Sequence, residues 1–469
     1  MKPSSYIRLP FRNIWRNRRR TLVTLITIMI GEMAVLIFGG YASAVVHGVQ
    51  TGVVRQVGHL QLQRPGFFTI GTSTPADYGI SDYNAIIQQL EADPVLKPML
   101  KVATSQLQLQ GIVGDFNLGV SRSVAGVGYD ARDQNKMRQW NEYKFPGDIR
   151  PIALPENQSN VLSIGIGVAR SLHLCGVLNV PSCASDPLPA KKVSNGAAAP
   201  DDIGALLDVH AKEAVPSTPL QSGPRLDVLA ATSGGAPNVL NARVAAAESL
   251  GVKEIDDSYL AMPLEMAQQL VYGRDKPQVT SVVIQLNESS QVEPAREQLK
   301  ALIKAKGWNL EVMDYRTLYP VYDQIAGLFG SIFGFVSMLI GVIVLFSVAN
   351  TMSASVMERT VEIGTLRSMG MRRSGIARQF ISEGLLIGIM GTVLGGALAL
   401  LCAYFINSAG LTWTPPNSID KNPLVVHVFN SPDLVFGSLL ILIALAAVSS
   451  LLPAYRAARI PVVEALRHV

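Results

Sequence analysis

Residues capable of acid–base, nucleophilic or metal chemistry are few in this chain, and their spacing forms no catalytic set. The sequence contains no GxSxG, HExxH or paired CxxC pattern, and no GxxxxGK[ST] loop to cradle a nucleotide phosphate. The six histidines are scattered: His47, His59, His173, His210, His427 and His468. We therefore expect a chain that is not an enzyme and that holds no metal, cofactor or ATP of its own.

The three cysteines allow one local disulfide. Cys175 and Cys183 lie close together in a polar region, whereas Cys402 falls in an apolar stretch and suits a small packing residue. In an oxidising compartment the pair can form a disulfide. Two free thiols in a loop are the alternative, and no further Cys or His completes a zinc pattern.

Two carboxylates interrupt apolar stretches. An acid near the centre of a membrane span, as Glu32 would be, costs on the order of 2.5–3.5 kcal/mol. We expect Glu32 to face a subunit interface or a wet inner wall, or else to make a purely structural hydrogen bond. Glu383, near the end of another stretch, has the same two interpretations.

Four apolar stretches determine the fold class. They cover about 21–46, 325–355, 380–406 and 434–452. Each has the roughly 20 apolar residues that cross a hydrocarbon core about 30 Å thick, and none has the polar face of a soluble helix. The sequence therefore predicts a membrane protein with four transmembrane α-helices and a large α/β periplasmic domain inserted between helices 1 and 2.

Basic residues fix the orientation. They crowd the first 20 residues, the 356–378 connection and the tail after 452, whereas 407–433 has only Lys421. Because basic residues near span ends stay in the cytoplasm, both termini and the 356–378 loop are expected there, with 47–324 outside. The net charge of +5 then reflects topology, and no nucleic-acid partner is expected. A cleaved signal peptide ending near Ala42-Ser43-Ala44 is the competing interpretation of the first stretch.

The external domain reads as mixed α/β, built of small βαβ-like modules. Ser81 and Asp82 are candidate helix N-caps. A Pro-, Ala-, Ser- and Gly-rich segment at about 175–224 is expected to be a flexible insertion, either inert or a lid over a groove, with a short helix near 203–212. The expected strands are 53–63, 103–113, 118–127, 227–231 and 279–286, and the expected helices are 81–92, 165–174, 264–272 and 292–306.

The sequence predicts nine segments in chain order. They are an interfacial N-terminal helix at 1–20, span one at 21–46, the periplasmic domain at 47–324, span two at 325–355, a cytoplasmic segment at 356–378, span three at 380–406, a short periplasmic loop at 407–433, span four at 434–452 and a cytoplasmic tail at 453–469.

The segment after span two predicts a short amphipathic helix. Apolar residues stand at 363, 366 and 369, with charges at 358, 359, 362 and 367. Gly370 stands where a left-handed C-terminal cap is wanted. Such a helix presents a ridge to a cytoplasmic partner, although a helix that merely touches lipid headgroups fits the pattern almost as well.

Three motifs resemble those of the FtsX-like/MacB permease family of ABC transporters. They are the segment from Asn350 to Gly370, the tail Leu452–Arg467 and the opening Arg12–Thr21. The segment Gly58–Gly66 (GHLQLQRPG) is more similar to lipoprotein-releasing permeases of the LolC/LolE type. The tail departs from the family pattern at Pro461, where an Asp commonly precedes Pro; a short helix is still expected there.

The resemblance implies a dimeric permease subunit in a Gram-negative inner membrane, driven by a separate pair of ATPase subunits that bind ATP and Mg²⁺. Two identical copies are favoured over a related second permease. Segment 358–370 would be the coupling helix that docks on the ATPase. Its candidate residues are Glu358, Arg359, Glu362, Ile363, Leu366, Arg367, Met369 and Gly370.

The resemblance also implies mechanical transmission, in which ATPase closure moves the coupling helices and the spans carry that motion outward. Span two is expected to run unbroken from Tyr315. Glycines would let spans approach, for sliding or for static packing; these are Gly330, Gly334, Gly341, Gly384, Gly388, Gly391 and Gly395.

The expected substrate is a lipoprotein or another hydrophobic molecule at the outer leaflet, with membrane lipids and a periplasmic substrate protein or adaptor as further partners. Tripartite drug or toxin efflux is one alternative. An FtsX-like signalling scaffold that controls a periplasmic hydrolase is another.

Overall fold

The computed structural model describes residues 18–115, 119–145, 149, 151–156, 158–180, 183, 223–414, 422–429 and 431–467. These residues form two units. A helical unit is built from the described parts of Met1–Thr51, Tyr319–Trp413 and Asn422–Val469, and a sheet unit is built from those of Gly52–Leu318 and Thr414–Lys421. The predicted interfacial helix before residue 18, most of the predicted insertion and its 203–212 helix lie outside the described residues.

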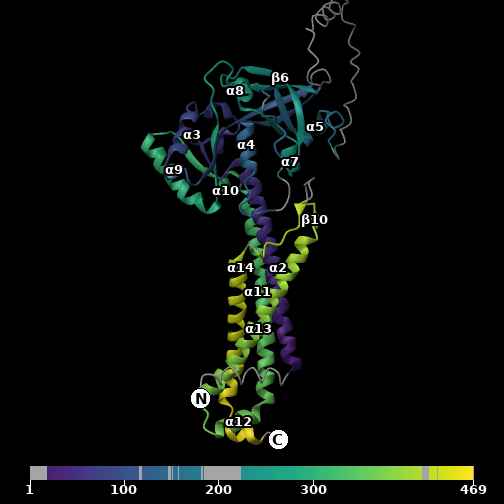
Figure 1. Cartoon of the computed structure of the whole chain (residues 1–469), viewed down its shortest axis with the longest axis vertical. Coiled ribbons are helices and arrows are strands. Elements are labelled where there is room, and N and C mark those ends of the chain that lie inside the picture. The colour runs from purple at the N-terminus through teal and green to yellow at the C-terminus, as the bar shows by residue number, and fades with distance from the viewer. Residues whose placement is uncertain are drawn as a thin grey trace, which may run out of the picture. The chain divides into compact units, whose positions relative to one another are not determined.

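Four long helices make up the helical unit and lie side by side (Figure 1). By length and composition, each can cross a membrane. The four are α2 (Arg18–Val57), α11 (Val321–Glu358), α13 (Arg373–Ser408) and α14 (Pro432–Arg459). The predicted four spans therefore exist as helices, each longer than its apolar stretch.

In the helical unit, apolar side chains fill the packed centre and also cover the outward faces of the helices. Ile28 of α2, Val348 of α11 and Ala446 of α14 are fully buried in its centre. On the outer faces, Phe346 and Phe436 remain 68% and 66% exposed. Helices that are apolar on their outward faces as well as in their packed centre suit a lipid surrounding rather than water.

Short elements complete the helical unit. Helix α12 (Thr360–Ser368) follows α11 after a break at Arg359, and α15 (Val462–Arg467) follows α14. Strands β10 (Thr412–Trp413) and β11 (Asn422–Pro423) pair between α13 and α14. The tail helix predicted after Pro461 is therefore confirmed in α15.

A nine-stranded sheet organises the described part of the other unit. Pairings run β2–β3–β7–β4–β6–β5 and return to β2, so that six strands close into a ring. Strands β8, β1 and β9 extend from the other edge of β2. The strands are β1 (Leu60–Gln63), β2 (Leu100–Asp115), β3 (Val120–Tyr129), β4 (Val161–Gly165), β5 (Arg225–Ala231), β6 (Pro237–Glu248), β7 (Tyr259–Pro263), β8 (Ser281–Leu286) and β9 (Glu311–Asp314).

Two apolar clusters hold this unit. Leu107 and Leu109 of β2 pack with α8 (Leu264–Tyr272) inside the first cluster, and the second places α3 (Tyr83–Ala92) and α9 (Val292–Lys306) against β1 and β8. The smaller elements are η1 (Phe67–Gly71), η2 (Pro75–Tyr78), α4 (Ala131–Arg138), α5 (Ile166–Ser171), α7 (Lys253–Asp256), η3 (Ser289–Gln291) and α10 (Tyr315–Leu318).

Several local expectations for this unit were wrong. Residues 53–57 continue helix α2 rather than starting a strand. The expected N-cap position of Asp82 is confirmed, although its side chain makes no capping hydrogen bond. The sheet is mostly antiparallel, with parallel pairing only at β3–β7 and β4–β6 among the described strands, because hairpins such as β2–β3 replace βαβ crossovers. Span two also does not run unbroken from Tyr315, since α10 ends at Leu318 and α11 begins after Pro320.

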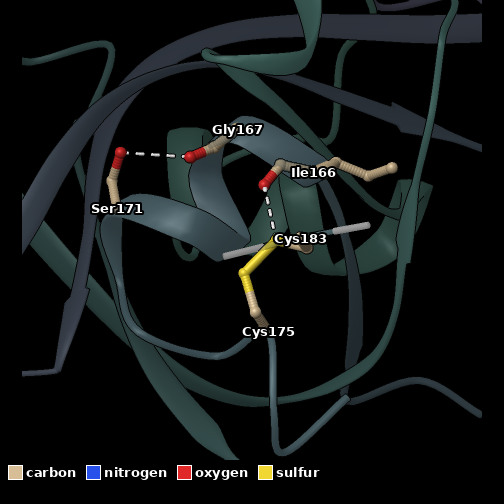
Figure 2. Close-up of a disulfide and its surroundings, with 5 residues drawn as sticks. All are labelled: Ile166, Gly167, Ser171, Cys175 and Cys183. Atoms are coloured by element: carbon tan, nitrogen blue, oxygen red, sulfur yellow. Dashed lines mark hydrogen bonds between the residues drawn. A yellow bond between two sulfur atoms is a disulfide. The ribbon is translucent and has the colours of Figure 1, made fainter. Parts of the chain in front are cut away.

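A disulfide joins Cys175 to Cys183 beside helix α5 (Figure 2). The Cys183 Sγ lies 3.9 Å from the carbonyl oxygen of Ile166, the first residue of α5. Ser171, the last residue of α5, donates a hydrogen bond to Gly167 O at 3.0 Å. The structure confirms the expected disulfide and not the alternative of two free thiols.

Candidate functional site

The predicted coupling segment forms helix α12, which ends at a glycine. Gly370 has φ +92°, a left-handed conformation that other residues adopt at a cost. Around it, Gly370 N donates to Arg367 O and Met371 N donates to Leu366 O, each at 3.0 Å. These bonds satisfy carbonyl groups that the end of a helix leaves open, and they fix where α12 stops.

The inward face of α12 is packed into the helical unit. Ile363 is 2% exposed and lies in a cluster with Val356 of α11, Phe380 of α13 and Ala454 of α14. Leu366 is half-buried against the same cluster. Through this cluster, α12 contacts three of the long helices.

Charged side chains bind both ends of α12 to neighbouring helices. At its start, Arg359 Nη1 lies 2.9 Å and 3.1 Å from the two carboxylate oxygens of Glu383, and both side chains are buried. Near its end, the Arg367 guanidinium donates to the carbonyl oxygen of Ile460, just after α14. Arg20 of α2 pairs with Glu358 at 2.6 Å, but this pair is exposed and contributes little stability.

The outward face of α12 carries a ridge of exposed side chains. Val361, Thr365 and Met369 follow one another at four-residue spacing, with Glu362 beside Val361. Met369 is 71% exposed and Val361 44% exposed. We call these four residues the outer ridge.

The eight predicted coupling residues therefore divide by position. Glu358, Glu362, Met369 and Gly370 are exposed, Leu366 and Arg367 are half-buried, and Arg359 and Ile363 are buried. The buried pair cannot touch a docked partner while α12 keeps this packing. Val361 and Thr365 were missed, although their spacing from Met369 could have indicated them.

Glu32 is enclosed by its own chain. Its side chain is fully buried, and Oε1 accepts a hydrogen bond from Ser438 Oγ of α14 at 2.8 Å. Among the described residues, Oε2 has no hydrogen-bond partner. The expectation that Glu32 faces a subunit interface or a wet wall was wrong, because α13 and α14 enclose it; the structural hydrogen bond is what the structure has. Glu383 is likewise used internally, by Arg359.

Glycines of α13 bring three helices into close contact. A methyl group on Gly384 would lie 2.6 Å from Ser450 Cβ, and one on Gly388 would lie 2.7 Å from Ala446 Cβ, both on α14. On Gly395 it would lie 2.6 Å from the backbone oxygen of Met29 in α2, and on Gly391 it would lie 2.7 Å from Cγ2 of Ile28, also in α2. Such close backbone approach is the usual role of glycine between membrane helices.

The glycines of α11 behave differently from those of α13. Gly341 lies near Leu445, 3.2 Å from its built Cβ position to Leu445 Cδ1, whereas Gly330 and Gly334 have no described atom within 4 Å of theirs. These two glycines therefore do not serve close packing among the described residues.

The junction between α2 and the sheet was not predicted. The last carbonyl groups of α2 accept side-chain bonds from three glutamines: Gln285 to Val54 O at 3.2 Å, Gln134 to Arg55 O at 3.0 Å and Gln61 to Val57 O at 2.8 Å. Gly58 then turns the chain with φ +73°. Side-chain amides thus replace the hydrogen-bond partners that a helix end lacks.

His59 fills the centre of this junction. Its Nδ1 accepts from Leu286 N at 3.0 Å, and its ring meets Trp140 edge to face with ring centroids 4.9 Å apart. Its Nε2 lies 3.5 Å from Ser289 Oγ, which donates to Glu142 Oε2 at 2.8 Å. Burial, with a smaller contribution from the charge of Lys101, lowers the pKa of His59 to about 3. A neutral, enclosed imidazole of this kind serves structure rather than acid–base chemistry.

Among the described residues, no group of three or more His, Cys, Asp or Glu side chains could hold a metal ion. The described candidate site is a packed helix with an exposed ridge.

Comparison with known proteins places this helix in a recognised domain. Residues 331–462 match the family model described as FtsX-like permease C-terminal. The match begins within α11 and ends in α15, so it includes α12 and all of α13 and α14.

Relatives in curated collections carry related names. The chain is 27% identical to a macrolide export ATP-binding/permease protein MacB of Nitrobacter winogradskyi, over 47% of this chain and 32% of the relative. It is 27% identical to the lipoprotein-releasing system transmembrane protein LolC of Haemophilus influenzae, over 34% and 39%. For an uncharacterized ABC transporter permease of Methanocaldococcus jannaschii the values are 25%, 45% and 51%. The chain thus spans about a third to a half of the length of these relatives.

Proposed function

We propose that this chain, whose residues 331–462 form an FtsX-like permease C-terminal domain, is the membrane subunit of an ABC transporter and works with a separate ATPase. It lies in the inner membrane with α12 in the cytoplasm and the sheet unit in the periplasm. The observation that carries the proposal is the outer ridge of α12, exposed on a helix whose other face is packed into the spans.

The geometry of α12 supports a docking role. A surface that receives force must be exposed and firmly attached. Val361 and Met369 satisfy the first condition, and the buried Arg359–Glu383 pair with the Ile363 cluster satisfies the second. A helix that only touched headgroups would need neither the buried ion pair nor the Arg367 bond to Ile460.

Helix α2 supports the transmission of motion. Arg20, near its beginning, pairs with Glu358 beside α12, and its last turn is held by Gln61, Gln134 and Gln285 of the sheet unit. One continuous helix therefore has defined contacts with the coupling segment and with the sheet. We propose that ATP-driven movement of α12 reaches the sheet unit through α2.

For the substrate, we propose a lipoprotein or another hydrophobic molecule taken from the outer leaflet. The GHLQLQRPG segment, which resembles lipoprotein-releasing permeases, supports this choice over drug efflux; the relatives themselves carry both kinds of name at 27% identity. In this chain that segment forms the junction itself, with Gly58 at its turn and Gln61 bonded to the end of α2. As dimer partner we propose a second copy of this chain.

Aspartate substitutions on the outer ridge test the docking role. Val361→Asp and Met369→Asp should abolish co-purification of the ATPase, because each puts a charge into an apolar contact without disturbing the buried cluster. Ser374→Asp, at another exposed position near the start of α13, is the matched control and should retain the ATPase. Leu366→Asp is not suitable, since it would also damage the cluster around Ile363. Unchanged co-purification and ATPase activity in both ridge variants would refute the docking assignment.

A further inference from the structure

A groove with both apolar and polar lining lies along strands β2, β3 and β7 of the ring, entirely within the sheet unit. Its volume is about 250 Å³, and its floor is formed by Gln106, Gln108 and Gln110 of β2 with Ala125 and Tyr129 of β3 and Tyr259 of β7. The family match at residues 331–462 does not include this groove, although its lining includes Val57 and Gln134 of the α2 junction. We call it the glutamine groove.

The glutamines share one face because they alternate with leucines. Leu107 and Leu109 point into the apolar cluster, so Gln106, Gln108 and Gln110 point to the opposite face of β2. The strand register places Gln106 beside Tyr129 and Gln110 beside Ala125, which in turn stands beside Tyr259. The floor is therefore a polar row beside a small residue, with a tyrosine on either side.

The hydrogen-bonding capacity of this floor is unused. Among the described residues, the side-chain amides of Gln106, Gln108 and Gln110 have no hydrogen-bond partner, although Gln106 and Gln108 are half-buried. Each amide offers two donors and an acceptor. Partly enclosed amides gain most from a ligand that satisfies both kinds of group.

The charge of the groove favours a neutral ligand. Arg138 in its wall is the single charged side chain of the lining, and it is already paired with Glu248 at 2.8 Å. Burial raises the pKa of Tyr259 to about 12, so its hydroxyl stays neutral at physiological pH. An ionic ligand would find no unpaired opposite charge here.

The spacing of the amides matches one kind of ligand. Same-side residues of a strand repeat every 6.6–6.8 Å or so, and the backbone amides on one side of an extended peptide repeat at the same interval. From Gln106 to Gln110 the row extends roughly 14 Å by this rise. Gln110 and Ala125 are exposed, which leaves that end open for a chain to continue.

We propose that the glutamine groove binds an extended, uncharged polar peptide segment, whose backbone groups pair with the amides of Gln106, Gln108 and Gln110. A linker between a membrane anchor and a folded domain has this chemistry. That the segment belongs to the transported substrate rests on the proposed function, but binding itself does not, because it requires neither ATP nor the ATPase.

The test uses the full chain in lipid nanodiscs and a fluorescein-labelled, end-blocked Ser-Gly-Asn-Gly-Ser-Gly peptide, followed by fluorescence anisotropy. Saturable binding is expected, and the same peptide with methylated backbone nitrogens should bind at least tenfold more weakly. Gln108→Ala should weaken binding on the order of 2- to 10-fold, the effect of one neutral hydrogen bond. Ala125→Trp should abolish binding by filling the groove.

Gln269→Ala is the matched control, because Gln269 is exposed on α8, a helix that packs on the other face of β2, and should leave the affinity unchanged. Thermal unfolding of each variant establishes that it is folded. Absence of saturable binding, equal binding of the methylated peptide, or unchanged affinity in Gln108→Ala would overturn the proposal. So would binding of N-acetylglucosamine in place of the peptide. If the unsubstituted chain does not bind the peptide but still co-purifies with the ATPase, this inference is refuted and the proposed function is not.

Discussion

Arg359 Nη1 lies 2.9 Å from Glu383 Oε1 and 3.1 Å from Oε2, with the two side chains 5% and 3% exposed. The pair connects the break between α11 and α12 to the third long helix, 24 residues further along the chain. Because both charges are withdrawn from solvent, neither can be left alone without a large penalty. The beginning of α12 is therefore fixed to α13.

Removal of one partner of this pair should destabilise the helical unit strongly. Arg359→Met or Glu383→Leu leaves a buried charge without its counterion, for which a loss of about 3–5 kcal/mol is typical. The double variant, which removes both charges, should recover most of that loss. Thermal unfolding of the three variants in detergent gives the comparison, and equal losses in the double and single variants would show that the charges are not coupled.

Glycine-to-alanine substitutions should destabilise the chain at glycines that pack closely against another helix, and not at glycines on open helix surface. Gly395→Ala places a methyl group 2.6 Å from the backbone oxygen of Met29, which no side-chain movement relieves, so a loss of about 1–3 kcal/mol is expected. Gly334→Ala meets no described atom and should leave the stability of the chain unchanged or slightly higher. The melting temperatures of the two variants, measured side by side, decide the matter. A Gly395→Ala variant as stable as Gly334→Ala would contradict the close contact of α2 and α13.

Ser438→Ala should expose the cost of burying Glu32. The substitution removes the hydroxyl that donates to Oε1 and leaves the carboxyl group without a partner among the described residues, at about 1–3 kcal/mol. Ser331→Ala, which removes an exposed hydroxyl bonded to Gly327 O, is the control and should cost little. Replacing Glu32 by Leu as well should restore part of the stability lost in Ser438→Ala. If the two serine variants unfold alike, the Glu32 bond is not significant.

Acid should weaken the junction around His59. Its pKa is about 3 in the folded chain and about 6.5 when unfolded, so the unfolded state binds an extra proton between these values. The stabilising contribution is therefore fully present above pH 6.5 and is lost as the pH falls towards 3. Between pH 7 and pH 5 the loss is about 2 kcal/mol.

The measurement is the free energy of unfolding of the full chain as a function of pH. Substitution His59→Leu should remove this part of the pH dependence, although it also lowers stability at neutral pH by breaking the bond to Leu286 N. A pH profile identical in the two proteins would show that His59 is not the responsible group.

Much of the helical unit could be predicted from sequence, because long apolar stretches leave few alternatives to a membrane helix. The end of α12 was also predicted from sequence, since Gly370 terminates it by its left-handed conformation, whereas its start after a break at Arg359 was not. The sequence did not show which residues of α12 face inward and which face outward. Arg359 and Glu362 are both charged positions in the predicted helix, yet Arg359 is buried against the carboxylate of Glu383 whereas Glu362 is exposed.

The errors in the sheet unit share one cause, which is that tertiary contacts outweigh local preference. The β-branched pair Val53 and Val54 suggested a strand, but the helix persists because Gln285 bonds to Val54 O from a distant strand. The alternation of Gln108 and Leu109 predicted a strand correctly, whereas the groove beside it depends on α4 and β7, which are remote in sequence.

The most direct test of the account is the side of the membrane on which α12 and the sheet unit lie. Ile70 of η1 is 69% exposed and Met369 of the outer ridge 71% exposed, so a cysteine at either position is accessible. Of the native cysteines, Cys175 and Cys183 are bonded to each other and Cys402 lies within α13. In cells with a permeabilised outer membrane, a membrane-impermeant maleimide should label Ile70→Cys at once and Met369→Cys only after lysis. Labelling of Met369→Cys before lysis, with Ile70→Cys protected, would contradict the account.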